Sequence, residues 1–180
     1  MIQVRFAGLG GQGILLMGEI LGEAAVFDKK YVGQTASYGS EARGSACRSD
    51  VVISESWIDY PEVTEADVLA CMSQGTYEQL SKKVNPTEAT IFYDAQMVKP
   101  DPSSKAKHVP IPATERAFKE FNSRMVANIV LLGAVVKGAR LVQEESLLKS
   151  LANRVPPAFL DLNQKAVKLG FELTGTKFTR

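Results

Sequence analysis

The chain has 180 residues, of which 45% are hydrophobic and 23% are charged, and its formal net charge is +1 at pH 7. This composition is typical of one globular domain with a substantial core, and the near-neutral charge argues against a nucleic-acid-binding protein. Two distant cysteines and a single histidine argue against a disulfide framework and against a metal site, either zinc or an iron–sulfur cluster, held by this chain alone.

Short β-rich runs alternate with longer amphipathic stretches along the chain. Runs such as VLACM and TIFY are apolar without polar alternation, which favours strands covered on both faces. We expect strands at residues 3–7, 31–34, 51–54, 68–72, 90–93 and 109–111. We expect helices at residues 14–27, 77–84, 114–121, 125–137, 144–153 and 158–169.

This alternation predicts βαβ units. The expected fold class is therefore α/β, a Rossmann-like three-layer αβα arrangement with a mostly parallel sheet and a helix-rich C-terminal third. We expect a single domain over residues 1–180, with residues 174–180 as a flexible tail. The N-terminus lacks the basic flank and the cleavage site of a signal peptide, so we expect a cytoplasmic protein without membrane contact.

Individual residues predict where helices begin, end and pack. Thr76 followed by Gln79 fits a capping box at a helix start, and Gly138 and Gly170 are expected to end helices in the left-handed conformation. The apolar stretch 125–137 is too short to span a bilayer. We interpret it as a central buried helix, with a face covered by another subunit as the alternative. Asn128 inside it needs a hydrogen-bond partner, because an unsatisfied buried amide costs about 1–3 kcal/mol.

The segment FAGLGGQG, residues 6–13, follows a predicted strand and opens a predicted helix. Its glycines Gly8, Gly10 and Gly13 match the dinucleotide-binding pattern G-x-G-x-x-G. In that pattern the first glycine permits a tight turn, the second lets the backbone approach an anion, and the third lets the helix pack closely on the strand. The N–H groups at the start of the helix would then favour a phosphate.

The remainder of the dinucleotide-binding pattern is missing. A nicotinamide-binding domain has an acidic residue at the end of its second strand, which binds the ribose hydroxyls. Here Gln34 and Thr35 occupy that place, Asp28 precedes the strand, and the next arginine, Arg43, lies beyond a further loop. A self-sufficient NAD(P)-dependent oxidoreductase is therefore kept as an alternative.

A second motif, YGSEARG, begins at Tyr38 and is followed by SACRSDVVIS, a further predicted strand. Together with GLGGQG it resembles the gamma subunit of the 2-oxoacid:ferredoxin (or flavodoxin) oxidoreductases, whose chains carry a GxGGQG loop and then a Tyr-Gly-x-Glu-x-Arg-Gly segment. The resemblance continues through ADVLACMSQGTYEQL, Asn128, Gly133 and LNQKAVKLG, whereas Ser45 stands where the family usually has glycine. The matching motif residues are Gly8, Gly10, Gly11, Gln12, Gly13, Tyr38, Gly39, Glu41, Arg43 and Gly44.

The resemblance implies a role within a larger enzyme. Such enzymes oxidatively decarboxylate a 2-oxoacid to an acyl-CoA and pass electrons through iron–sulfur clusters to ferredoxin or flavodoxin. The resemblance implies that thiamine diphosphate and [4Fe-4S] clusters lie on alpha, beta and delta-type subunits, that this chain binds no cofactor alone, and that it holds no catalytic residue. Its motif residues would face coenzyme A and the cofactor-bearing subunits. The YGSEARG form favours the 2-oxoglutarate enzyme over the pyruvate, branched-chain and indolepyruvate enzymes.

The chemistry of the two motifs suits an anion, with two structural alternatives. A glycine loop at a helix N-terminus and a nearby guanidinium can both bind phosphate oxygens. Arg43 could instead pair with Glu41 and hold its loop rigid, and the glycine loop could serve packing alone. A module that binds no ligand and only assists assembly is therefore the second alternative.

Four other places carry polar or reactive side chains. We interpret His108 as a surface or hydrogen-bonded histidine, residues 73–75 as a helix-starting turn at the carboxyl edge of the sheet, and Asp94 as a loop-capping carboxylate. Cys47 is interpreted as a small buried residue, although Arg48 beside it could lower the pKa of the thiol.

Overall fold

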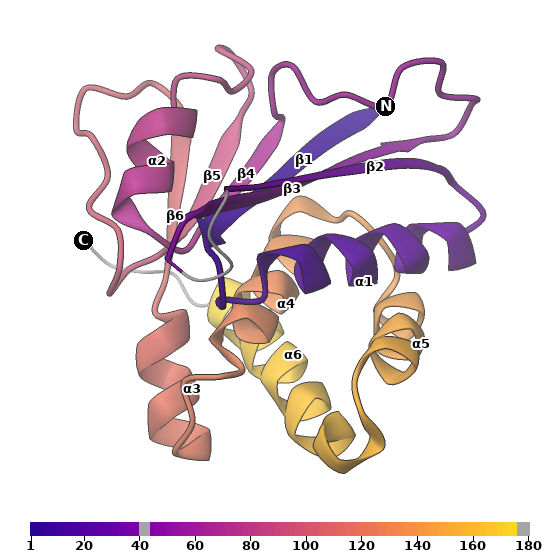
Figure 1. Ribbon diagram of the computed structural model, residues 1–180, viewed down its shortest axis with the longest axis vertical. Helices are drawn as coiled ribbons and strands as arrows, with labels where there is room; N and C mark the ends of the chain where they lie inside the picture. The colour runs from indigo at the N-terminus through magenta and orange to yellow at the C-terminus, as the bar shows by residue number, and fades with distance from the viewer. Residues whose placement is uncertain (40–43, 176–180) are drawn as a thin grey trace.

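The computed structural model describes residues 1–39 and 44–175. Its strands form one six-stranded sheet in the order β2-β3-β1-β4-β5-β6, which Figure 1 shows running through the upper half of the molecule. The strands are β1 (Ile2–Leu9), β2 (Tyr31–Tyr38), β3 (Ala46–Ser54), β4 (Val68–Cys71), β5 (Thr90–Asp94) and β6 (Lys107–Ile111). All six were predicted, but β2 and β3 are at least twice as long as expected.

The sheet is mostly parallel, which confirms the predicted fold class. The pairs β1–β4, β4–β5 and β5–β6 are parallel. However, β3 runs antiparallel to both β1 and β2. The strand that follows the first helix is therefore separated from β1 by β3, an arrangement that a simple βαβ alternation does not predict.

Helices cover both faces of the sheet, as expected for three layers. In Figure 1, α1, α4, α5 and α6 lie below the sheet and α2 lies above it. The helices are α1 (Ile14–Phe27), α2 (Gln74–Leu80), α3 (Ala113–Phe121), α4 (Ala127–Ala139), α5 (Glu144–Arg154) and α6 (Leu160–Gly175), with a 3₁₀ turn, η1, at Pro157–Phe159. Within the described part of the chain, none of these helices has the length and apolarity needed to cross a bilayer.

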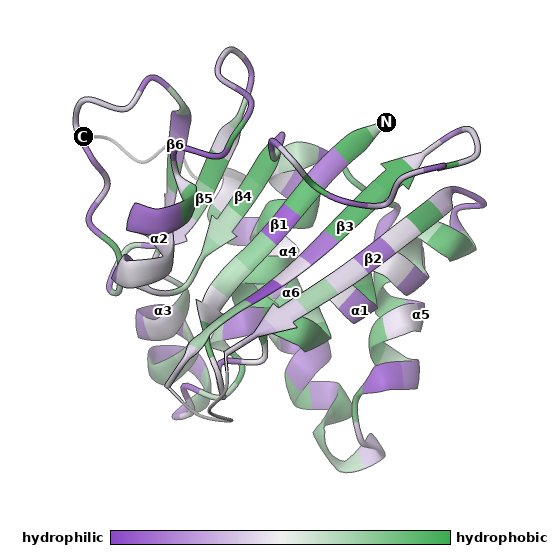
Figure 2. Ribbon diagram, turned by 45° about the horizontal axis from the view of Figure 1, so that its top comes forward, coloured by the Kyte–Doolittle hydropathy of each residue, from purple (hydrophilic) through white to green (hydrophobic). Residues whose placement is uncertain are grey.

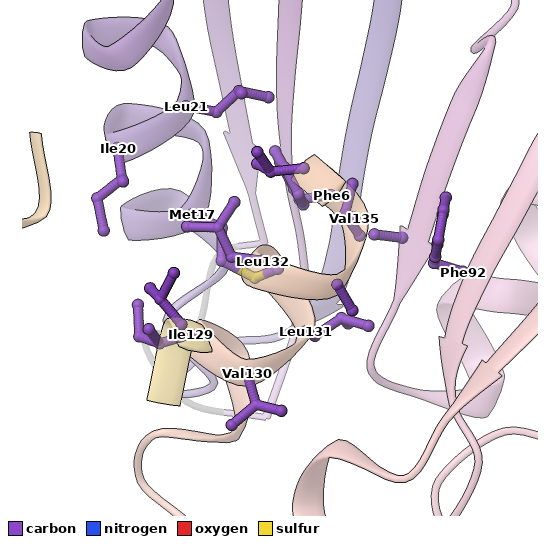
Figure 3. Close-up of a cluster of buried hydrophobic side chains, with 14 of the residues drawn as sticks. Phe6, Met17, Ile20, Leu21, Phe92, Ile129, Val130, Leu131, Leu132 and Val135 are labelled. Atoms are coloured by element: carbon purple, nitrogen blue, oxygen red, sulfur yellow. The ribbon is translucent and has the colours of Figure 1, made fainter. Parts of the chain in front are cut away.

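The larger core lies between the sheet and the helices below it. Residues 127–136 of α4 are all buried, which confirms the prediction of a central buried helix. Figure 3 shows side chains of α1, α4, β1 and β5 gathered in this cluster, among them Met17, Leu132, Phe6 and Phe92. This core fixes α1, and with it the end of the glycine loop, against α4.

A smaller core lies on the opposite face, between the sheet and α2. Its centre is apolar, with Tyr77 of α2 and Leu69 and Ile91 of the sheet fully buried. Beside it, Arg5 and Asp50 form a buried bidentate ion pair, with Nε–Oδ1 at 2.7 Å and Nη2–Oδ2 at 2.8 Å. The pair joins β1 to β3 in their antiparallel register, so it stabilises the unexpected part of the topology.

Two helices were predicted to end at glycine residues, and both predictions are wrong. α4 continues through Gly138 and ends at Arg140, which has φ 54°, and α6 continues beyond Gly170. Both glycines instead permit close packing: a Cβ added at Gly138 would lie 2.7 Å from the Phe92 ring, and one at Gly170 would lie 2.1 Å from Val130 O.

Two other predicted boundaries also differ. Ser73, not Thr76, is the N-cap of α2, and its side chain accepts a hydrogen bond from Thr76 N–H. At the other end of the chain, Thr174 Oγ1 donates to Ala134 O over 3.1 Å. Residues 174 and 175 lie in α6, and residues 176–180, the rest of the predicted tail, lie outside the described residues.

Candidate functional site

The two glycine-rich motifs meet at the carboxyl end of β1. Gly10 N–H donates to Ser45 O over 2.9 Å, and Gly44 N–H donates to Gly10 O over 3.4 Å. Gly39, at the end of β2, donates its N–H to Ala46 O, which closes the base of the β2–β3 hairpin. The structure thus brings together the described residues of both motifs, while Glu41 and Arg43 fall outside the described residues.

The glycines of the loop act differently from those of the dinucleotide-binding pattern. Gly8 lies inside β1 rather than in the turn, and a Cβ there would lie 2.5 Å from Gln12 Oε1. Gly11 and Gly13 have φ values of 94° and 73°, the left-handed conformation that side-chain-bearing residues rarely adopt. Gly13 packs against Asn128 of α4 rather than against a strand. The loop is therefore shaped by its own glutamine and by a distant helix.

Gln12 joins the ends of two parallel strands. Its Oε1 accepts a hydrogen bond from Leu9 N–H over 2.7 Å, and its Nε2 donates to Met72 O over 3.1 Å. The helices that follow β1 and β4 lie on opposite faces of the sheet, and open α/β sheets bind ligands at such a switch point. The Gln12 side chain spans this point, so its amide is already engaged within the chain.

Asn128 holds the other end of the loop. Its Nδ2 donates to Gly13 O over 3.3 Å, which supplies the partner that the sequence predicted for this amide. Asn128 is buried, and its Oδ1 has no hydrogen-bond partner among the described residues. A Cβ on Gly13 would lie 2.3 Å from Asn128 Nδ2. The contact therefore requires glycine at position 13.

The electrostatics of the loop favour an anion, but fewer amides are available than the pattern predicts. The N–H groups of Gly10 and Gln12 donate within the chain, to Ser45 O and Leu9 O. The first turn of α1 carries no acidic residue, so no carboxylate of that turn neutralises the partial positive charge of the helix N-terminus. No heavy atom outside the neighbouring residues lies within 4 Å of a Cβ built on Gly11, which leaves open space beside the loop.

Two hollows flank the glycine loop, and Gly11 and Gly13 line both. The larger, of about 500 Å³, is bounded on its far side by Tyr38 and Cys47. The smaller, of about 300 Å³, is closed by Asn128 and by the apolar side chains of Phe159 and Leu162. Phe159 and Leu162 were not singled out from the sequence, because apolar residues of a helical stretch look like ordinary core residues.

Cys47 does not have the reactive character that its neighbour suggested. Burial raises the pKa of the Cys47 thiol above its ordinary value, so the thiol is protonated at neutral pH. Arg48 reaches toward Asp50 instead, with Nε 3.9 Å from Oδ2. The interpretation of Cys47 as a small buried residue is confirmed.

The other polar candidates have structural roles. His108 Nε2 forms a 2.9 Å hydrogen bond with Tyr77 Oη, and its Nδ1 lies 2.9 Å from Ala106 O. Asp94 accepts hydrogen bonds from Gln96 N–H and from the backbone and hydroxyl of Thr114, as expected for a loop-capping carboxylate. Ser73 caps α2, which confirms the helix-starting turn at residues 73–75.

Gln34 and Thr35 do not lie at the end of the second strand, where a dinucleotide-binding fold has its ribose-binding acid. β2 continues to Tyr38, so Gln34 and Thr35 lie in the middle of the strand rather than at its end. Gln34 faces α1, because a Cβ on Gly22 would lie 3.3 Å from Gln34 Oε1. Asp28 lies at the opposite end, as predicted, where it accepts hydrogen bonds from Gln143 N–H and Ser146 Oγ.

Sequence similarity shows to which family of proteins this chain belongs. Residues 3–173 match the family model described as pyruvate ferredoxin/flavodoxin oxidoreductase. The chain belongs to this family. The 2-oxoglutarate synthase subunit KorC of Methanocaldococcus jannaschii is 39% identical over 174 residues, which cover 95% of this chain and 92% of that protein. The common gamma subunit of the Pyrococcus abyssi pyruvate/ketoisovalerate oxidoreductases is 29% identical, with 97% of each chain covered.

Solved structures of the oxidoreductase family share the fold. The gamma subunit of a keto/oxoacid ferredoxin oxidoreductase from Geobacter sulfurreducens has a TM-score of 0.85 and 34% identity, over 97% of this chain and 98% of that one. The 2-oxoglutarate:ferredoxin oxidoreductase of Magnetococcus marinus, solved with 2-oxoglutarate, coenzyme A and succinyl-CoA bound, has a TM-score of 0.84 and 25% identity over 96% of this chain and 31% of that one. This chain is accordingly a gamma-type subunit of an oxidoreductase complex, and the NAD(P)-dependent alternative finds no support.

Proposed function

We propose that this gamma chain serves a 2-oxoglutarate:ferredoxin oxidoreductase, which converts 2-oxoglutarate and coenzyme A to succinyl-CoA and carbon dioxide and passes two electrons to ferredoxin or flavodoxin. Four KorC relatives are 33–39% identical to this chain, whereas the pyruvate/ketoisovalerate gamma subunits are 28–29% identical. This difference in identity supports 2-oxoglutarate as the substrate over pyruvate.

The proposed site on this chain is the joined pair of glycine motifs. The observation that carries it is the hydrogen bond from Gly10 to Ser45, because it brings the N-terminus of α1 beside Gly44, the sequence neighbour of Arg43. Of the ten motif residues, we assign the ligand-facing role to Gly11, Gly13, Tyr38 and Arg43. Gly8, Gly10, Gln12, Gly39 and Gly44 shape the loops that present them, and Glu41 stays a predicted site residue to which we assign no contact.

The residues present fit the phosphates of coenzyme A. Open space lies beside Gly11, the first turn of α1 carries no acid, and an arginine can bind phosphate oxygens through two parallel hydrogen bonds. Coenzyme A, when bound, supplies the thiol that accepts the acyl group. The part of this chain is to hold the ligand through backbone amides and the Arg43 guanidinium.

The redox chemistry belongs, in this proposal, to companion chains. Alpha, beta and delta-type subunits would carry thiamine diphosphate and the [4Fe-4S] clusters, and ferredoxin or flavodoxin would dock on the complex, in the cytoplasm. In residues 1–39 and 44–175, no group of three or more histidine, cysteine, aspartate or glutamate side chains is arranged to hold a metal ion.

Titration calorimetry of coenzyme A into the assembled complex tests the proposed site. Arg43→Ala should weaken coenzyme A binding roughly tenfold, about 1.4 kcal/mol, and raise the KM for coenzyme A more than it lowers kcat. Arg48→Ala is the matched control, because Arg48 lines the hollow beside α2 and should leave coenzyme A binding unchanged.

The outcomes separate this proposal from its alternatives. Unchanged affinity and turnover in the Arg43→Ala complex would remove Arg43 from the site. A complex that assembles and binds coenzyme A normally after both Arg43→Ala and Gly11→Ala would identify the chain as an assembly module without a ligand.

A further inference from the structure

β2 is one of the two edge strands of the sheet. Residues 34–38 are all exposed, and Tyr38 retains 71% of its accessible surface. β2 pairs with β3 on one side, and no described residue donates to or accepts from its backbone on the other side. Alternate residues of such a strand direct N–H and C=O groups away from the neighbouring strand. Figure 2 shows β2 along the margin of the sheet, with this edge uncovered.

The two edge strands differ in the features that prevent pairing with other chains. β6, with the sequence KHVPI, contains Lys107 and Pro110, and lysine and proline are residues that natural proteins use to block edge pairing. β2, with the sequence YVGQTASY, has eight residues without a charge or a proline. A long uncharged edge is a template for a further strand. The sequence therefore protects one edge of this sheet and leaves the other open.

The open part of β2 is the half nearest the glycine loop. At Gly33 the strand is covered, because an added Cβ would lie 2.4 Å from Pro61. Beyond Gln34 the side chains face two hollows: Tyr38 lines the one beside Gly10 and Gly11, and Ser37 lines the one of about 500 Å³ beside α2. The exposed half of β2 thus borders the surface assigned above to coenzyme A and the companion subunits.

We propose that β2 accepts an extended segment of a companion subunit as a seventh strand of the sheet. In this mode of recognition, backbone hydrogen bonds supply affinity and alternate side chains supply specificity. Thr35, Ala36 and Ser37 are small and exposed, so this half of the strand leaves room for larger side chains on the incoming segment. The inference rests on the proposed function, which brings a companion chain to the glycine loop at the open end of β2. For that reason the occupant is a companion chain rather than a second copy of this one.

Amide hydrogen exchange, measured by mass spectrometry, tests the strand addition directly. Outward amides within residues 34–38 should exchange at least roughly tenfold more slowly in the assembled complex than in the full chain alone. Amides in α5, which are bonded within their own helix, serve as the reference and should keep their rates. Unchanged exchange of residues 34–38 in the assembled complex overturns the proposal. Protection that appears in the chain alone and grows with its concentration identifies a second copy as the occupant and also overturns it.

A matched pair of lysine substitutions provides the second test. Ala36→Lys introduces a charge into the open edge and should weaken binding of this chain to its companions roughly tenfold. Ala152→Lys makes the same substitution at an exposed position of α5 and should leave assembly unchanged. Unchanged thermal midpoints of both variant chains alone would confirm that they fold. Equal assembly of the two variants contradicts the strand addition.

The two proposals fail in different ways. Suppose that the β2 amides become protected in the complex but Arg43→Ala leaves the coenzyme A affinity unchanged. This result contradicts the coenzyme A site alone. A complex that depends on Arg43 for coenzyme A but leaves β2 unprotected contradicts the strand addition alone.

Discussion

Gly13 connects the conformation of the loop to the core. Its φ is 73°, and an added methyl group would lie 2.3 Å from Asn128 Nδ2. Gly13→Ala therefore combines an unfavourable backbone conformation with a clash against a buried side chain. We expect the free energy of unfolding to fall by about 2–4 kcal/mol, as measured by urea denaturation of the full chain.

Gly11→Ala is the matched control for this prediction. Gly11 has φ 94°, but no heavy atom beyond its chain neighbours lies within 4 Å of an added Cβ, so backbone strain alone should cost about 1–2 kcal/mol. Asn128→Ala removes the neighbour, and Gly13→Ala should then cost less in that background. Equal costs of Gly13→Ala with and without Asn128 would show that this amide does not restrict the loop.

The side-chain amides of Asn128 and Gln12 hold the glycine loop. The role of the first could be predicted from the sequence, and the role of the second could not. Asn128 was predicted to need a partner because it interrupts a strongly apolar stretch. Gln12 was interpreted as part of a ligand site, since a polar residue within a glycine loop carries no sign that it bonds inward to Leu9 and Met72. The positions of Glu41 and Arg43 relative to the loop lie outside the described residues, so their roles stay predictions.

The close packing of helix α6 on helix α4 depends on the glycine at position 170. A Cβ on Gly170 would lie 2.1 Å from Val130 O and 2.8 Å from Ala134 N, both backbone atoms that cannot rotate away. Gly170→Ala should force the helices apart and lower the free energy of unfolding by at least about 2 kcal/mol. Gly22→Ala in α1 is the control, because its nearest neighbours are the flexible side chains of Gln34 and Val32 at 3.3 and 3.5 Å.

Gly170→Ala and Gly22→Ala should have different effects on the free energy of unfolding. Gly22→Ala gains up to about 1 kcal/mol of helix propensity and should leave stability equal or raised, as followed by thermal unfolding. The close approach of α4 and α6 would not require glycine if Gly170→Ala proved as stable as the unchanged chain.

Glu23 joins α1 to α5 and makes their contact sensitive to acid. Burial opposes ionisation of the carboxyl group, but hydrogen bonds from Ser150, Arg154 and Asn153 outweigh it and hold the pKa of Glu23 below its ordinary value of 4.5. Because the folded pKa is the lower one, the ionised carboxylate stabilises the fold above pH 4.5, and this contribution disappears as pH falls through the folded pKa. Acid should therefore weaken the α1–α5 contact at this residue.

Glu23→Gln measures the contribution of that carboxylate. The variant should be less stable than the unchanged chain by about 1 kcal/mol at pH 7, a modest value because the groups are partly exposed and screened by solvent. The difference should be smaller at about pH 3 than at pH 7, because acid protonates the carboxyl group first in the unfolded state and then, at the lower folded pKa, in the folded state. Glu88→Gln makes the same substitution on an exposed loop, away from the α1–α5 contact, and serves as the control. A Glu23→Gln deficit of equal size at both pH values would contradict the assignment.

Helices and strands could be predicted where the hydrophobic pattern and the local residue chemistry agree. They were predicted less well where contacts distant in the chain determine the structure. α1 has the predicted bounds, and α4 was recognised from its apolar residues. β2 and β3 were predicted too short because their outer halves, TASY and ACRSD, lack the apolar character of buried strands. Gly138 and Gly170 were misassigned because a glycine that ends a helix and one that admits a neighbouring backbone look alike in sequence. The antiparallel placement of β3 depends on pairings distant in the chain, including Arg5 with Asp50.

For the whole molecule, the insertion of β3 between β1 and β2 limits what the glycine loop can bind. In a dinucleotide-binding fold, the strand after the first helix returns beside the first strand, and its terminal acid meets the ribose. Here β2 returns to the sheet edge and ends at Tyr38. The parallel neighbour of β1 is β4, which is followed by Met72 and by Ser73, the cap of α2. Among the described residues, therefore, neither strand end beside the loop carries the carboxylate that a nicotinamide cofactor needs.

This topology predicts that NADH and NADPH leave the full chain without added thermal stability. A ligand that binds only the folded state adds about 2.7 kcal/mol at 100 times its Kd, which for a domain of this size raises Tm by roughly 5–11 °C. We expect no such rise at millimolar NADH or NADPH, because Gln12 spans the switch point between β1 and β4 and no described residue at either strand end offers an acid to the ribose. Coenzyme A added to the assembled complex is the positive control. A rise in Tm with NADH that Gln12→Ala enhances would mean that the switch point is open to a dinucleotide after all, and the division of labour between this chain and its companions would have to be redrawn.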